Sequence, residues 1–176
     1  RADGVDALAI VLMHGFASDR FNTSPLARSL ATAGYAVLAV DVAGHGANRN
    51  GRFEHSSGQR GPFFDELQSA VDYLRRSRYV DGERIVMAGH SMGASSSLAY
   101  GSLDPTVDGL VMIAGGWRVT GPHRPANALF IYAEGDPERI RTASAAMAAR
   151  IAGVPGLAAD QLSGDFDLGT AVMHTE

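Results

Sequence analysis

The chain has 176 residues, 45% of them hydrophobic, which is enough to bury the core of one compact domain over residues 1–176. Its net charge of −4 argues against a general surface for nucleic acid or anionic membranes, because no basic stripe gathers the 15 Lys and Arg residues. The absence of cysteine excludes disulfides, thiolate chemistry and cysteine-based zinc sites.

Short apolar runs alternate with helical patterns along the first half of the chain. Residues 7–13 are continuously apolar, which is typical of a strand buried on both faces of a parallel sheet. Ser24 as N-cap and Pro25 in the first turn predict the start of a helix that Gly34 ends. The elements predicted in this half are a strand over 7–13, a helix over 24–34, a strand over 35–42, a polar loop over 44–61 and a helix over 64–74.

The second half continues the same alternation. It predicts a strand over 84–88, a helix over 94–100, strands over 110–114 and 128–132, and a helix over 137–151. Residues 154–169 are expected to be the least structured segment, a mobile loop, and 171–176 a strand-like end. This order predicts an α/β fold, a three-layer sandwich around a mostly parallel sheet with ligands at the carboxyl ends of the strands.

The most informative motif is Gly89-His90-Ser91-Met92-Gly93, which follows one predicted strand and opens the next helix. A serine presented at such a sharp turn needs small residues two positions before and after it, so that strand and helix can approach. The turn would expose the Ser91 hydroxyl and aim the N–H of Met92 at an oxygen bound beside it. The structural alternative is that Ser91 serves only as the N-cap of the helix.

Two further motifs and a candidate acid accompany this turn, and together they resemble the α/β-hydrolase family from Ala7 to Glu176. His14-Gly15-Phe16, after the first predicted strand, looks like the family's H-G-x oxyanion loop, so the resemblance implies that the N–H groups of Phe16 and Met92 form an oxyanion hole. Residues 41–46 resemble its D-x-x-G-x-G turn. Because Arg1 is not a methionine and the chain stops in an apparent strand, we expect a single-domain fragment of this fold, truncated at both ends.

The resemblance implies a serine hydrolase that cleaves a carboxylic ester or related acyl bond through an acyl-enzyme. Only residues 115–127 join two predicted strands where lidded members carry an insertion, so the chain looks more like dienelactone hydrolases or small esterases without an evident lid. Two alternatives remain open: a non-catalytic binding or scaffolding domain, and an acyltransferase on the same fold.

The resemblance also assigns the catalytic acid to Asp136, with Glu134 as the other candidate and helix capping as the structural alternative. Chain order in the family is serine, acid, histidine, and His174 is the only histidine after Asp136. His174 falls inside the last predicted strand, whereas the family's histidine follows that strand. We therefore expect the base beyond residue 176, with His174 as the fallback. Because His14 and His90 precede the acid, we expect them to be structural or pocket-lining.

Neither a cofactor nor a metal is expected. The six histidines lack metal-binding spacing, the glycine-rich turn at 44–46 lacks the third glycine of a dinucleotide fingerprint, and no phosphate-binding loop motif occurs. The expected partner is a small-molecule acyl substrate, with no nucleic acid and no evident membrane contact. The sequence leaves oligomeric state and cellular location open.

Overall fold

The structure, a computed structural model, describes residues 7–49, 63–116, 121–123, 127–152 and 158–164. Six strands in this part form one parallel sheet in the order β2-β1-β3-β4-β5-β6. The strands are β1 (Leu8–Met13), β2 (Ala36–Val40), β3 (Asp81–His90), β4 (Gly109–Ile113), β5 (Asn127–Ala133) and β6 (Ala158–Gly164). The helices are α1 (Ser24–Thr32), α2 (Phe64–Arg76), α3 (Met92–Gly101) and α4 (Glu138–Ala152).

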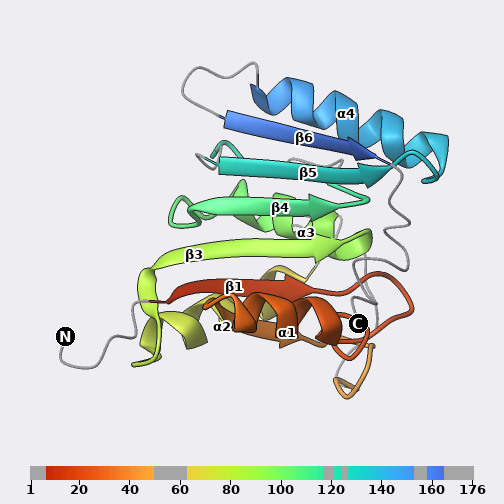
Figure 1. Ribbon diagram of the computed structural model, residues 1–176. Helices are drawn as coiled ribbons and strands as arrows, with labels where there is room; N and C mark the ends of the chain where they lie inside the picture. Colours follow the sequence, from red (N-terminus) through yellow and green to blue (C-terminus); the bar gives the residue numbers. More distant parts are fainter. Residues whose placement is uncertain (1–6, 50–62, 117–120, 124–126, 153–157, 165–176) are drawn as a thin grey trace.

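The helices cover both faces of the sheet, which confirms the predicted three-layer α/β fold (Figure 1). Helix α1 packs Leu26 and Leu30 onto one face, against Ile10 and Leu12 of β1. Helices α2, α3 and α4 pack onto the other face. The main core lies on that second face; its largest fully buried side chains include Tyr100, Phe130, Leu67, Leu98, Met87 and Met112.

The apolar runs form strands because parallel strands covered on both faces must bury both rows of side chains. In β1, residues 9–13 are all buried. Helix α1 ends where Gly34 adopts a left-handed φ of +96°, with the N–H of Gly34 donating to Ala31 and that of Tyr35 to Leu30. The glycine stop predicted from the sequence is therefore confirmed.

Two expectations need correction. Ser24 is the first residue of α1 and Thr23 its N-cap, because Pro25 occupies the second helical position. Residues 158–164, expected within a mobile loop, form β6 and pair with β5 from Asn127 to Ala133. The predicted strand-like segment over 171–176 lies outside the described residues, as do 154–157 and 165–169.

Within the described part of the chain, none of the helices is long and apolar enough to cross a membrane.

Candidate active site

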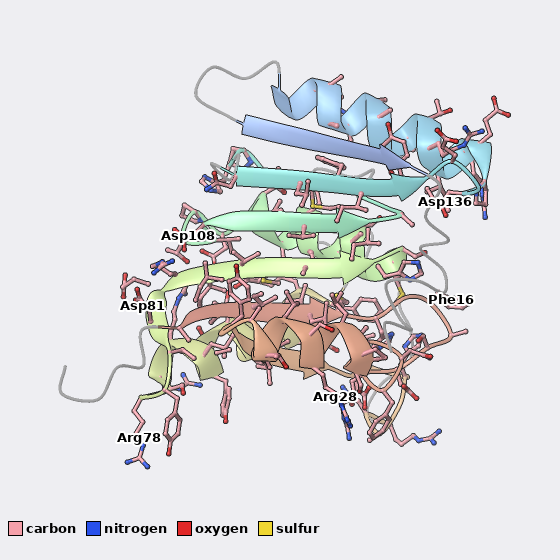
Figure 2. The ribbon with its side chains drawn as sticks, viewed as in Figure 1. Phe16, Arg28, Arg78, Asp81, Asp108 and Asp136 are labelled. Atoms are coloured by element: carbon pink, nitrogen blue, oxygen red, sulfur yellow. The ribbon has the colours of Figure 1, made fainter. Side chains whose placement is uncertain are left out.

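The predicted functional residues gather at the carboxyl edge of the sheet. Ser91 follows β3 directly, and Asp136 follows β5 by three residues. Figure 2 labels Phe16 and Asp136 at this edge, while Asp81 and Asp108 lie at the opposite edge. Because all strands are parallel, their carboxyl ends meet on one side, where ligands of open α/β sheets bind.

Ser91 adopts a backbone conformation that few non-glycine residues take. Its φ is +52° and its ψ −109°, a strained combination that typically costs about 1–3 kcal/mol. Both flanking peptide groups are held: the Ser91 N–H donates to the carbonyl of Ile113 at 2.8 Å, and its carbonyl accepts from the N–H of Ser95 at 3.2 Å. This is the sharp strand-to-helix turn that the sequence predicts, with the serine half-buried at its apex.

Glycines make the turn possible because backbones meet where side chains would otherwise stand. A Cβ on Gly89 would lie 2.3 Å from the backbone carbon of Gly93, and one on Gly93 would lie 2.4 Å from the carbonyl oxygen of Met13. The first contact sets α3 against β3, and the second sets both against the end of β1. A Cβ on Gly115 would meet the Ser91 carbonyl at 2.4 Å, so the end of β4 also packs against the turn.

The loop after β1 packs onto the same turn. A Cβ on Gly15 would lie 3.6 Å from the Cβ of Ser91 and 2.9 Å from Nδ1 of His90. The backbone of Phe16, the next residue, therefore starts close to Ser91. On the other side, the N–H of Met92 opens α3, where the first-turn donors lack a helical acceptor and the helix dipole is positive. These two positions are the ones that the resemblance to α/β hydrolases implies for an oxyanion hole.

A buried carboxylate ties this loop to the turn after β2. The side chain of Asp41 is only 3% exposed and accepts hydrogen bonds from the backbone N–H of Arg20 at 2.7 Å and that of Ala47 at 2.9 Å. It also forms an ion pair with the Arg20 guanidinium. The sequence motif flagged Asp41, but nothing in it identified Arg20, which stands 21 positions earlier.

The electrostatics of Asp41 follow from these contacts. Burial alone would raise the pKa of the Asp41 carboxyl, but the N–H groups of Ala47 and Arg20 and the Arg20 charge outweigh it, so the pKa lies below its ordinary value of 3.8. The carboxylate therefore stays charged at neutral pH and holds the two loops together.

Asp136 lies in the turn after β5. Its Oδ2 accepts the N–H of Ala133 at 2.9 Å, and its own backbone carbonyl accepts Nε–H of Arg141 at 3.1 Å. Among the described residues, Oδ1 carries no hydrogen bond, and the residue is half-buried. Glu134, the other candidate acid, is exposed. The carboxylate bonds back to β5 rather than to the first turn of α4, which argues against the capping alternative.

Ser144, on α4, was not singled out from the sequence. Its buried hydroxyl donates to the carbonyl of Gly115 at 3.0 Å. Gly115 in turn packs against the Ser91 carbonyl, so the helix that follows the acid turn is tied to the segment beneath the serine. The residues joined by this bond stand 29 positions apart, and no local pattern marks them.

We expected His14 and His90 to be structural or pocket-lining groups, and the contacts of His14 are those of a structural residue. His14 is fully buried; its Nε2 accepts the N–H of Val42 at 3.4 Å, which leaves the proton on Nδ1 to donate to the Gly15 carbonyl at 2.7 Å. Burial lowers the pKa of His14, which favours this neutral form. Burial also lowers the pKa of His90, and the charge of Asp136 offsets part of that shift. His174 lies outside the described residues.

The described residues hold no cluster of three or more His, Asp or Glu side chains that could bind a metal ion.

The parallel sheet and the serine turn between β3 and α3 define an α/β-hydrolase fold. The sequence profile of the family described as "Serine aminopeptidase, S33" matches residues 6–144. The chain belongs to this family of α/β hydrolases. No curated protein matches the chain at a significant level.

Many solved structures share the fold, including the following two. A ferulic acid esterase from Streptomyces cinnamoneus matches with a TM-score of 0.63 at 24% identity, over 93% of this chain and 52% of that one. DcsB, solved in complex with its substrate analogue, matches with a TM-score of 0.55 at 20% identity, over 62% of this chain and 38% of that one. The chain thus spans about half or less of the length of these relatives.

The Gly89 contact predicts a large loss of stability on substitution. In Gly89→Ala, the new Cβ would stand 2.3 Å from the Gly93 backbone and push α3 away from β3. We expect the free energy of unfolding to fall by about 3 kcal/mol or more, measured by urea denaturation. Gly135→Ala is the matched control, because nothing lies within 4 Å of its added Cβ. Equal losses in the two variants would contradict the packing argument.

Asp41→Asn should make the free energy of unfolding less dependent on pH in the acid range. Because the folded pKa of Asp41 is depressed, its contribution is fully present above the ordinary value of 3.8 and is lost as pH falls through the lower folded pKa. We expect the variant to be less stable than the unsubstituted protein by about 2 kcal/mol near neutral pH, and the gap to close in strong acid. Urea denaturation across this pH range measures the gap.

Asp81→Asn is the control for this series, since Asp81 caps a turn at the opposite edge of the sheet (Figure 2). A constant gap between Asp41→Asn and the unsubstituted protein at all pH values would refute the role of the Asp41 charge.

Proposed function

We propose that the protein is a serine hydrolase that cleaves a carboxylic ester or related acyl bond through an acyl-enzyme, with Ser91 as the nucleophile. The observation that carries this proposal is the strained turn at Ser91, whose backbone is held on both sides while the hydroxyl stands at the carboxyl edge. Strain of this kind persists only where surrounding contacts impose it, and it concentrates at active sites. A helix N-cap needs no such conformation.

The N–H groups of Phe16 and Met92 are the proposed oxyanion donors. They come from two different segments, since the Gly15 contact brings the loop after β1 beside Ser91 and Met92 follows Ser91 as the first residue of α3. A carbonyl attacked by Ser91 becomes a tetrahedral oxyanion, and two fixed donors would stabilise it more than they stabilise the planar ester. Loss of one such donor typically costs about 3 kcal/mol in the barrier.

Asp136 is the proposed acid. Ser91 follows β3 and Asp136 follows β5, so β4 separates them, and two strand spacings of about 4.8 Å leave room for one imidazole between them. That imidazole would take the serine proton, donate its other N–H to Oδ1 of Asp136, and later protonate the leaving group. The proposed base is a histidine after Asp136 in the chain: a residue beyond position 176, or His174.

Support for an ester substrate comes from the structural neighbour from Streptomyces cinnamoneus, which is a ferulic acid esterase. The family description names a serine aminopeptidase, which cleaves a related acyl bond. Both activities use the same acyl-enzyme chemistry and differ in the leaving group. Acyl transfer to an acceptor other than water, and binding without catalysis, are the alternatives on this fold.

Labelling of the full-length protein, with any chain that extends beyond residue 176, by a fluorophosphonate probe tests the nucleophile. A serine with an engaged base forms a stable phosphonyl adduct, so we expect mass spectrometry to locate one adduct on Ser91 and none in Ser91→Ala. Ser69→Ala, which alters an exposed serine of α2, is the matched control and should label like the unsubstituted protein. Absence of an adduct on Ser91 would favour the binding-domain alternative. A loss of labelling in His174→Ala would identify His174 as the base.

Asp136→Asn tests the acid. The amide cannot hold the histidine in the tautomer that accepts the serine proton, so the rate of labelling and the kcat of ester hydrolysis should fall by about a thousandfold or more. Glu134→Gln alters a carboxylate in the same turn that is exposed, and serves as the matched control. A larger loss in Glu134→Gln than in Asp136→Asn would reassign the acid to Glu134.

A further inference from the structure

Phe16 holds a large apolar ring in solvent at the carboxyl edge. Its side chain is 65% exposed, although most phenylalanines in the described part are buried or half-buried. A single exposed ring needs no explanation by itself. The Phe16 ring needs an explanation because of its position relative to the serine and because of the contacts that hold it.

The ring is fixed from behind by a cluster of other rings. His45 lies edge-on to Phe16 with ring centroids 5.9 Å apart, and it contacts Phe63 at 6.3 Å and His14 at 5.2 Å. His45 is itself buried, and its Nδ1 hydrogen-bonds the Ala43 carbonyl at 3.1 Å. Edge-to-face packing of this kind favours one orientation of the exposed ring.

The backbone around Phe16 is also fixed. Ala17 takes a left-handed φ of +56°, unusual for a residue with a Cβ, and turns the chain directly after Phe16. On one side Gly15 packs on Ser91, and on the other Arg20 is held by Asp41. The loop therefore presents the ring in a set place rather than letting it fold back into the core.

Phe16 directly follows Gly15, which packs on Ser91, so its backbone starts close to the proposed nucleophile. The N–H of Phe16 is a proposed oxyanion donor, so a carbonyl bound there lies within a few bond lengths of the Phe16 side chain. A flat apolar group on either side of that carbonyl would cover the exposed face of the ring and remove apolar surface from water.

We infer that the Phe16 ring, backed by His45, is a subsite for a flat apolar group of the substrate, so that the preferred substrates are esters with a phenyl-sized group beside the scissile bond. This inference rests on the proposed function. The flat group belongs either to the acyl part or to the leaving group, and these two sources share one recognition chemistry.

Three esters separate the possibilities. Methyl phenylacetate carries the flat group in its acyl part, phenyl acetate carries it in its leaving group, and methyl acetate carries neither. In Phe16→Ala, we expect the kcat/KM of one phenyl-bearing ester relative to methyl acetate to fall by about tenfold. Losses that come from a loosened oxyanion loop affect all three esters and cancel in this ratio. The ester whose ratio falls identifies the side of the carbonyl that meets Phe16.

Phe21→Ala is the matched control. Phe21 is 66% exposed and lies in the same loop, but it stacks under the Arg20 guanidinium, 4.8 Å from its ring centroid. Phe21→Ala should keep the kcat/KM ratios of the unsubstituted protein. The ratios of Phe16→Leu should lie between those of Phe21→Ala and Phe16→Ala. Unchanged ratios in Phe16→Ala with Ser91 still labelled by the fluorophosphonate would overturn the subsite alone. Failure to label Ser91 in the unsubstituted protein would overturn both the subsite and the proposed function.

Discussion

The backbone of Ser91 is the constraint on which the rest of the site depends. A residue with a positive φ at the end of a strand reverses the chain within one step, and α3 can begin there only because Gly89 and Gly93 let two backbones touch. The contact of Gly93 with Met13 then fixes the end of β1, and that of Gly115 with Ser91 fixes the end of β4. Three neighbouring strands thus end in mutual contact around one residue.

The contacts of Asp41 and His14 fix the loops after β1 and β2 without adding an unpaired charge near Ser91. Asp41 is charged but neutralised by Arg20 and two backbone donors, while His14 is kept neutral by burial and by its bonds to backbone groups. Fixed dipoles, foremost the start of α3, therefore supply the positive field at the turn. Such preorganised donors need no rearrangement when negative charge develops on a bound oxygen.

Local patterns explain which parts could be predicted from the sequence. Continuous apolar runs identified β1, β4 and β5, and glycine spacing identified the serine turn, because both depend on near neighbours in the chain. Strand β6 was missed because it includes Asp160, Gln161 and Ser163; among the described residues it pairs with β5 alone, and a strand at such an edge has less need for an apolar run. The bonds from Arg20 to Asp41 and from Ser144 to Gly115 join residues 21 and 29 positions apart, and only the folded topology reveals them.

The topology also restricts where a catalytic base can stand. With Ser91 after β3 and the proposed acid Asp136 after β5, an imidazole that contacts both would lie over the end of β4. A Cβ at Gly115 would collide with the Ser91 carbonyl and one at Gly116 with Met112, so the chain packs closely where it leaves β4. Oδ1 of Asp136 remains available there because Oδ2 is occupied by Ala133. In the proposed mechanism, the order of β3, β4 and β5 and Oδ1 of Asp136 would therefore set the position of the base.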